Sequence, residues 1–155
     1  MKQPSPKFAA LSASDIEELD HIELLFFAYK EFTADADRIL EGIGFGRAHH
    51  RVLFFVNRKP GLIVAELLDI LGITKQSLAR VLKQLIEAGY IDQEAGSHDR
   101  RQRHLYPTKA GRELILNLSL PQSRRIKAAL KQSSKAQDET IKNFLRQMTD
   151  IVPDR

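Results

Sequence analysis

Cysteine is absent from all 155 residues of the chain. Disulfide bonds, cysteine-ligated zinc and a thiol redox switch are therefore excluded. The absence fits a reducing compartment, and we expect the protein to be cytoplasmic.

Long hydrophobic runs are absent as well. Glu23 interrupts one of the longest apolar fragments, residues 22–29, and no run approaches the roughly 20 apolar residues of a membrane-spanning helix. The N-terminus contains neither a long apolar region nor a processing site, so we expect residues 1–13 to form a flexible leader. The sequence therefore predicts no membrane partner.

Signatures of catalysis are missing too. The sequence contains no nucleophile elbow, no phosphate-cradling glycine loop and no His-Glu-x-x-His segment. Adjacent histidines on a helix point about 100° apart, so His49 and His50 cannot chelate one metal as an i, i+4 pair can. The sequence predicts no enzyme, no cofactor and no metal site. The least favoured alternative is a metal-binding protein or hydrolase built on His49, His50, His98 and His104.

The composition is that of one soluble globular domain spanning residues 1–155, with 43% hydrophobic and 28% charged residues. The charge is unevenly distributed. Residues 15–41 carry two basic and nine acidic residues, a net of −7, whereas residues 74–112 carry eight basic and four acidic residues, a net of +4. A basic segment suggests contact with a polyanion, although long exposed helices also carry charge. The position of the segment in the fold has to decide.

Apolar stripes occur at both ends of the chain. Ser14, with Glu17 at the capping-box position, predicts that a long helix begins here. That helix and a last helix, at about residues 136–148, carry wider stripes than one small core can bury. A second copy of the chain is the simplest partner, because two-fold homodimers are the commonest oligomers.

Residues 62–89 predict a helix-turn-helix unit, whose second helix enters the major groove of DNA. Gly72 can adopt the left-handed conformation that ends the first helix, and Thr74 can cap the second. The exposed side of the second helix then carries the residues expected to contact the major groove: Lys75, Gln76, Ser77 and Arg80. An ordinary helical hairpin would show the same periodicity.

A predicted β-hairpin follows this helix directly. Residues 90–95 and 102–106 read as two strands, and Pro107 marks a strand end. A hairpin in this position is a wing, and its tip lies over an adjacent minor groove or the DNA backbone. Arg100 and Arg101 fall at that tip.

A long helix is expected after the wing. Thr108 can cap it, and Pro121 should kink or split it near Leu120 because proline removes a backbone hydrogen bond.

The segment AGYIDQEAGSHDRRQRHLYPTKAGREL, residues 88–114, resembles the MarR family of bacterial winged-helix transcription regulators. The shared features are a helix-ending glycine, a strand, an Asp-Arg-Arg tip, a returning strand and the Thr-x-Ala-Gly that opens the next helix. The Leu-Gly-Ile-Thr turn at residues 71–74 also fits, and the resemblance covers nearly the whole chain. The stretch at residues 44–61 is similar to the PetP-like branch of the family.

The resemblance implies a mainly α fold with a small β-hairpin. It implies dimerisation helices over residues 14–45 and 108–150, and a winged helix-turn-helix over residues 46–107 with its wing at 90–107. The protein is then expected to bind a palindromic site in double-stranded DNA as a homodimer and to regulate transcription. A small aromatic acid as effector, bound between the dimer helices and the DNA lobes, is common in the family. The sequence does not reveal whether this member has one.

The resemblance, for the wing, and the positions of the side chains, for the second helix and phosphate, suggest roles for single residues. Arg100 or Arg101 would enter a minor groove, with Asp99 as a brace that holds a neighbouring arginine. Arg80 would read a guanine edge. Phosphate would be held by Lys83, by Arg103 and by the amide of Thr74 or Lys75.

Two departures and one rival interpretation stay open. His104 and Pro107 stand where the family often has aliphatic residues, so the second strand is expected to be shorter or frayed. The rival is a helical interaction scaffold that has lost DNA binding. Such a scaffold would carry acidic or apolar residues on the recognition helix and wing tip, and this sequence keeps basic ones.

Overall fold

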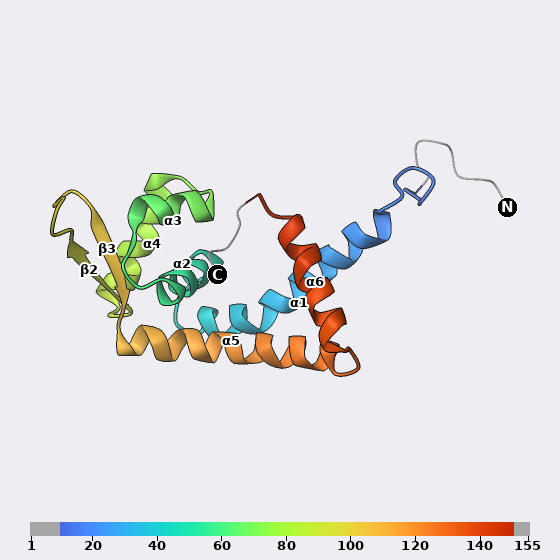
Figure 1. Ribbon diagram of the computed structural model, residues 1–155. Helices are drawn as coiled ribbons and strands as arrows, with labels where there is room; N and C mark the ends of the chain where they lie inside the picture. The colour runs from blue at the N-terminus through green and yellow to red at the C-terminus, as the bar shows by residue number, and fades with distance from the viewer. Residues whose placement is uncertain (1–9, 151–155) are drawn as a thin grey trace. The chain divides into compact units, whose positions relative to one another are not determined.

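The computed structural model describes residues 10–150, and the chain falls into two compact units, residues 1–34 and residues 35–155. Most of the expected leader at residues 1–13 lies outside the described residues. The elements in chain order are α1 (Leu19–Glu41), α2 (Arg47–Arg58), β1 (Leu62–Ile63), α3 (Val64–Leu71), α4 (Lys75–Glu87), β2 (Ile91–Ala95), β3 (Arg103–Pro107), α5 (Lys109–Leu130) and α6 (Lys135–Gln147) (Figure 1). The predicted fold class is confirmed.

Helix α1 begins at Leu19 rather than at Ser14, so the prediction that Ser14 and Glu17 cap it is wrong. The Asp15 carboxylate instead accepts hydrogen bonds from the amide and the hydroxyl of Ser12, at 2.9 and 3.0 Å. A short side chain that bonds to a nearby backbone group competes with helix formation, which delays the helix by about one turn.

The sheet has three antiparallel strands in the order β1-β3-β2. The central strand β3 is not frayed as expected, because His104 and Leu105 pair with β1 on one side and with β2 on the other. His104 also donates from Nδ1 to the carbonyl of Gly61 at 3.0 Å, so its polar side chain is used within the sheet. Pro107 closes β3 opposite Ile91, where its missing amide costs little. The two-residue strand β1 was missed because it is too short to show alternation.

One hydrophobic core holds residues 35–130 together. Helices α2, α3 and α4, the sheet and the first half of α5 contribute buried side chains, among them Leu53, Leu67, Leu85, Leu105 and Leu118. Glu66 fixes the start of α3 by accepting from the amide of Ile63 at 3.0 Å and from Lys59 at 2.9 Å. These bonds, the amide first, hold the pKa of the Glu66 carboxyl below its ordinary value.

Helix α5 is continuous through Pro121, so of the two predicted outcomes, a kink or a split, the split does not occur. Proline removes one helical hydrogen bond, and the bonds on either side keep the helix intact here. Thr108 caps α5 as predicted by accepting from the amide of Gly111 at 3.0 Å. A Cβ at Gly111 would stand 2.0 Å from the carbonyl oxygen of Tyr90, so only glycine allows α5 to start this close to β2.

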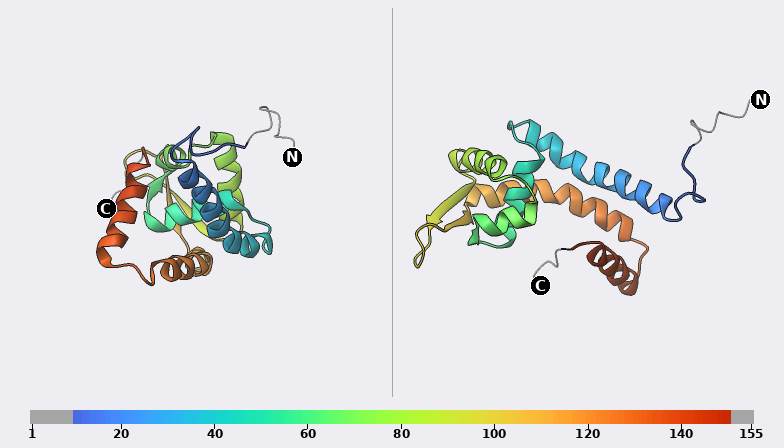
Figure 2. Two further views of the ribbon diagram at one scale, coloured as in Figure 1. Left: turned by 90° about the vertical axis from the view of Figure 1, so that its right-hand side faces the viewer. Right: turned by 90° about the horizontal axis from the view of Figure 1, so that it is seen from above.

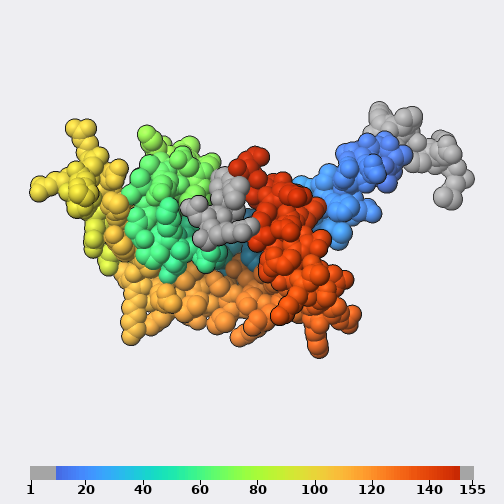
Figure 3. Space-filling view, in the orientation of Figure 1, coloured from blue at the N-terminus to red at the C-terminus, as the bar shows by residue number. Residues whose placement is uncertain are grey.

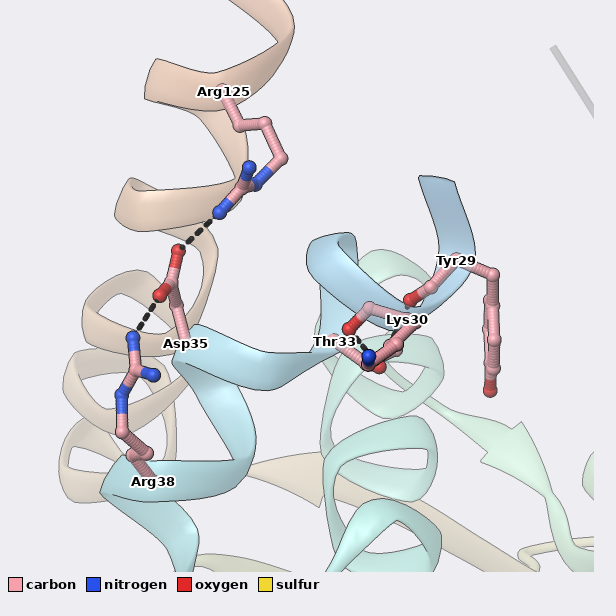
Figure 4. A network of polar contacts seen from close by, with 6 residues as sticks. All are labelled: Tyr29, Lys30, Thr33, Asp35, Arg38 and Arg125. Atoms are coloured by element: carbon pink, nitrogen blue, oxygen red, sulfur yellow. Dashed lines mark hydrogen bonds and ion pairs between the residues drawn. The ribbon is translucent and has the colours of Figure 1, made fainter. Parts of the chain in front are cut away.

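Asp35, near the end of α1, is joined to α5 by an ion pair (Figure 4). One oxygen of its carboxylate accepts from Arg125 at 3.2 Å, and the other accepts from Arg38 one turn along α1.

Among residues 10–150, no helix combines the length and the hydrophobicity that a membrane span requires.

Candidate nucleic-acid interface

Helix α4 starts where the sequence predicts. Gly72 ends α3 with φ of 60°, in the left-handed region, and Thr74 accepts from the amide of Ser77 at 3.1 Å. The Thr74 hydroxyl also donates to the hydroxyl of Ser77 at 3.0 Å. Both hydroxyls therefore serve the cap, and the half-buried Ser77 supports the helix end. The amides of Lys75 and Gln76 in the first turn keep no helical acceptor.

The two sides of α4 differ sharply. Leu78, Val81, Leu82 and Leu85 are buried in the core. The side chains of Lys75, Gln76, Arg80 and Lys83 are exposed, which confirms the predicted division between a packing face and a free face. The core holds α4 in place while its basic face stays in solvent.

A groove runs between α3, α4 and the hairpin, with a volume of about 700 Å³. Its floor is apolar and includes Val64, Leu68 and Leu82, whereas Lys75, Lys83 and Arg103 are the cations that line it. Arg103 therefore lies beside α4, at the groove, and not with Arg100 and Arg101 at the tip of the hairpin. Sequence reasoning missed the groove, because it forms where α4 packs against β2 of the sheet, and this packing joins residues distant in the sequence.

The tip of the hairpin is a tight loop. Two backbone hydrogen bonds of 3.0 Å close it. The amide of Gly96 donates to the carbonyl of Gln102, and the amide of Gln102 donates to the carbonyl of Asp99. Asp99 Oδ1 accepts from the amide of Arg101 at 2.9 Å. A Cβ at Gly96 would come within 2.5 Å of the Asp99 carbonyl oxygen. Asp99 thus braces the tip through the backbone of Arg101 and not through a guanidinium.

Arg100 and Arg101 are exposed on this loop, which extends beyond the helices of the lobe (Figure 2) and forms a projection on the space-filling surface (Figure 3). The loop shape is fixed by main-chain bonds, so the two guanidinium groups can move without disturbing the hairpin. Such a projection presents positive charge at a distance from α4.

The basic residues of this surface are not neutralised within the part of the chain that the structure describes. No carboxylate among residues 10–150 forms an ion pair with Lys75, Arg80, Arg100, Arg101 or Arg103. Lys83 lies 3.8 Å from Glu87, but both side chains are largely exposed and such a pair contributes little. The face made by α4 and the wing, defined by these six cations, is called the basic face below.

His49, His50 and His104 are part of the packed structure. His49 bonds to the amide of Gly46 and to Gln84, and His104 bonds to Gly61 as described. His50 is half-buried in α2, and burial lowers the pKa of its imidazole against the opposing effect of Asp37. His98 is exposed at the wing tip. Across residues 10–150 no three histidine, aspartate or glutamate side chains gather as metal ligands would.

Comparison with known proteins gives both sequence and structural relatives. The MarR family profile matches residues 43–102. The HTH-type transcriptional regulator PetP of Rhodobacter capsulatus is 46% identical over 129 residues, which cover 83% of this chain and 78% of PetP. This similarity agrees with the PetP-like character of residues 44–61.

Solved structures show the same winged-helix fold. A mutant of MepR from a multidrug-resistant S. aureus clinical isolate matches with a TM-score of 0.74 at 19% identity, over 83% of this chain and 94% of MepR. FabT of Streptococcus pneumoniae in complex with DNA matches with a TM-score of 0.71 at 17% identity, over 83% of this chain and 92% of FabT. The fold, the family profile and the close sequence relative agree: this chain belongs to the MarR family.

Proposed function

We propose that the protein is a cytoplasmic transcription regulator that binds a specific palindromic site in double-stranded DNA as a homodimer. The observation that carries the proposal is the basic face, in which six exposed cations lack a strong carboxylate partner in the described chain. Cations kept free on a protein surface are the usual means of binding DNA phosphate. The DNA-bound FabT structure supports this use of the fold.

The roles within the basic face follow from position. Gln76 and Arg80 lie one turn apart on the free side of α4, suited to base edges in a major groove, with Arg80 directed to guanine. Lys75, Lys83 and Arg103 surround the groove and are suited to phosphate. Ser77 contributes by holding the helix cap with Thr74, while the amides of Lys75 and Gln76 stay open to an anion.

The wing arginines are assigned to a minor groove. Arg100 and Arg101 project on a loop that is rigid in its backbone, and a narrow minor groove attracts guanidinium groups through its concentrated negative potential. A regulator of this kind needs no catalytic residue, which agrees with the missing signatures of catalysis.

Dimerisation is supported by the terminal helices. In α1, the large side chains of Leu24, Phe26 and Phe27 are between 55% and 73% exposed, and in α6 and its C-cap Phe144 and Met148 are 44% and 54% exposed. Apolar surface on this scale marks an interface. A second copy of the chain satisfies both stripes and explains a palindromic site, because a two-fold protein dimer matches a two-fold DNA sequence.

A small-molecule effector is supported by the groove. The groove has an apolar floor, and the cations in its lining, Lys75, Lys83 and Arg103, outnumber its one carboxylate, Glu87, which suits a small aromatic acid. Such a ligand would use cations that the proposal assigns to DNA, so we expect it to release DNA. Displacement of a bound duplex by an aromatic carboxylate, but not by its uncharged amide, would support this role.

Selection of binding sites from random duplexes tests the proposal. We expect an enriched palindrome with wild-type protein, and a relaxed base preference at one position of each half-site with Arg80→Ala. Lys83→Ala is the matched control, because removal of a phosphate-binding lysine weakens binding uniformly across sequences. No enrichment with the wild-type protein would favour a scaffold without DNA binding. Identical logos for both variants would contradict the role of Arg80.

A further inference from the structure

Helix α2 makes two polar contacts with the helix-turn-helix that the basic face does not explain. The first is at His49. Its Nδ1 lies 3.1 Å from the amide nitrogen of Gly46, and its Nε2 lies 2.8 Å from Oε1 of Gln84 on α4. The imidazole also stacks on Phe45 with ring centroids 4.5 Å apart, and Phe45 in turn meets the edge of Tyr90. The ring is therefore held on one face and at both nitrogens.

These bonds define the form of the imidazole. A backbone amide can only donate, so Nδ1 of His49 accepts and carries no proton. The proton is then on Nε2, which donates to the side-chain oxygen of Gln84. The neutral tautomer satisfies both partners, and neither nitrogen is free for another ligand.

The second contact is at Arg51, further along α2. Its guanidinium donates to the carbonyl oxygen of Leu71 at 2.9 Å. Leu71 is the last residue of α3, where Gly72 turns the chain away, so this carbonyl is one of those that a helix end leaves without a helical donor. Arg51 thus holds the turn that precedes α4.

The two contacts lie at opposite ends of α4. Leu71 precedes the start of α4, and Gln84 belongs to its last turn. Two directional bonds at opposite ends of a helix oppose its rotation and tilt, in addition to the packing of its apolar side in the core. Neither bond involves a residue of the basic face.

Helix α2 is itself firmly part of the core. Val52, Leu53 and Val56 are fully buried, and α2 packs against α5 as well as α4. A side chain on α2 that bonds to α4 is therefore anchored on an element with a fixed place in the core.

We propose that His49 and Arg51 are positioning residues for DNA recognition, which hold α4 at the angle its exposed face needs by bonding to Gln84 and to the Leu71 carbonyl. The inference rests on the proposed function. Base readout depends on the angle of α4 within a groove, whereas attraction to phosphate depends mainly on the number of cations. Loss of these bonds should therefore reduce specific binding far more than non-specific binding.

Substitutions by uncharged residues of similar size remove the His49–Gln84 bond and the Arg51–Leu71 bond one at a time. Glutamine at the third position of a helix can still accept from the N-cap amide, so His49→Gln keeps the bond to Gly46 and removes the imidazole that reaches Gln84. Gln84→Met removes the same bond from the other side, and Arg51→Met removes the guanidinium but keeps the aliphatic stem. Arg58→Met is the matched control, because Arg58 is an exposed arginine of α2 and forms no ion pair or side-chain hydrogen bond with any residue from 10 to 150.

The experiment compares affinity for the selected palindrome with affinity for a scrambled duplex, using full-length protein whose dimer content and thermal unfolding are measured in parallel. We expect His49→Gln, Gln84→Met and Arg51→Met each to weaken binding to the palindrome by about 3- to 10-fold. Binding to the scrambled duplex should stay within about twofold, as should both duplexes with Arg58→Met. The double variant at His49 and Gln84 should lose no more than either single variant, because both remove one bond.

Three results would overturn the inference. These are equal losses on the palindrome and the scrambled duplex, palindrome affinity unchanged in all three variants, or losses at His49 and Gln84 that multiply in the double variant. If a variant unfolds below the assay temperature, the remaining two decide by the same criteria. A wild-type protein that binds both duplexes equally would overturn the proposed function itself. That failure is recognised in the wild-type protein alone, whereas failure of the present inference is recognised in the variants of a wild-type protein that prefers the palindrome.

Discussion

Helices α4 and α6 are both 13 residues long and amphipathic, yet they are used in opposite ways. Helix α4 buries Leu78, Val81, Leu82 and Leu85, whereas α6 buries none of its residues. Their charges differ as well. In α6, Lys142 lies 2.7 Å from Asp138 and 3.0 Å from Glu139, while the cations of α4 are free or loosely paired within residues 10–150.

The difference separates two kinds of incomplete surface. The apolar side of α4 is satisfied within the chain, so its polar side is the surface that lacks a partner among the described residues, and the missing partner is anionic. In α6 the carboxylates raise the pKa of Lys142, so the polar side is satisfied locally and the apolar side is the exposed one. Under the proposed function, a DNA duplex would cover the polar side of α4, and a second copy of the chain would cover the apolar side of α6.

The largest expected effect comes from substituting one leucine on the apolar side of each helix. Leu85 is fully buried, so Leu85→Ala should lower the free energy of unfolding by about 2–5 kcal/mol. Leu145 is 48% exposed, so Leu145→Ala should leave the fold intact and shift the dimer toward monomer. Thermal unfolding and light scattering over a dilution series measure the two effects. Equal unfolding losses with an unchanged dimer would break the comparison.

Substitution of cations comes next. Arg101→Ala should weaken DNA binding by about 1–3 kcal/mol and leave the dimer folded. Lys142→Ala is the control from α6, and it should leave DNA affinity unchanged because its charge is already paired. Affinity at physiological salt that survives both Arg100→Ala and Arg101→Ala would refute the minor-groove role of the wing.

The helix caps offer a smaller test. Thr74 and Ser134 each accept from the amide three residues on, at 3.1 and 3.2 Å, so alanine at either position should cost about 1 kcal/mol of helix stability. For Thr74→Ala the loss should appear in both unfolding and DNA affinity, since the cap orients the first-turn amides. For Ser134→Ala it should appear in dimerisation, and in DNA affinity only through the smaller fraction of dimer. A DNA effect of Ser134→Ala that exceeds that of Thr74→Ala would contradict the division of roles.

The smallest expected effect is a pH dependence. Burial lowers the pKa of His50 below its ordinary value of 6.5, so the unfolded chain takes up a proton at this residue before the folded chain does. The stabilisation is complete above pH 6.5 and is lost as the pH falls below it. Denaturant titrations at several pH values should show that His50→Gln loses less stability in acid than the wild-type protein does. Parallel curves for wild type and His50→Gln would exclude the effect.

Much of the helix-turn-helix could be predicted, because the residues that mark its turn and its buried side lie close together in the sequence. Gly72 and Thr74 mark the turn, the spacing of Leu78 to Leu85 marks the buried side of α4, and all of these positions behave as expected. Asp15 shows where local reasoning failed, because its carboxylate could serve either a helix start at Ser14 or a turn with Ser12, and the turn won.

The contacts between elements could not be predicted. The groove beside Arg103, the short strand β1 and the bond between His49 and Gln84 each join residues distant in the sequence. No periodicity encodes such contacts, because they depend on how the sheet and helices pack. The role of Asp99 was half predicted: it is a brace, but it holds the backbone amide of Arg101.

The most direct test of the basic face is the salt dependence of binding to the selected palindrome. The logarithm of the association constant should fall linearly with the logarithm of salt concentration, with a slope of roughly −4 to −10 for a dimer that neutralises several phosphates. Lys83→Ala should reduce the magnitude of that slope by about 1 for each phosphate that the lysine no longer neutralises, and Lys142→Ala should leave it unchanged. A slope near zero for the wild-type protein, or the same slope in all three proteins, would contradict the account.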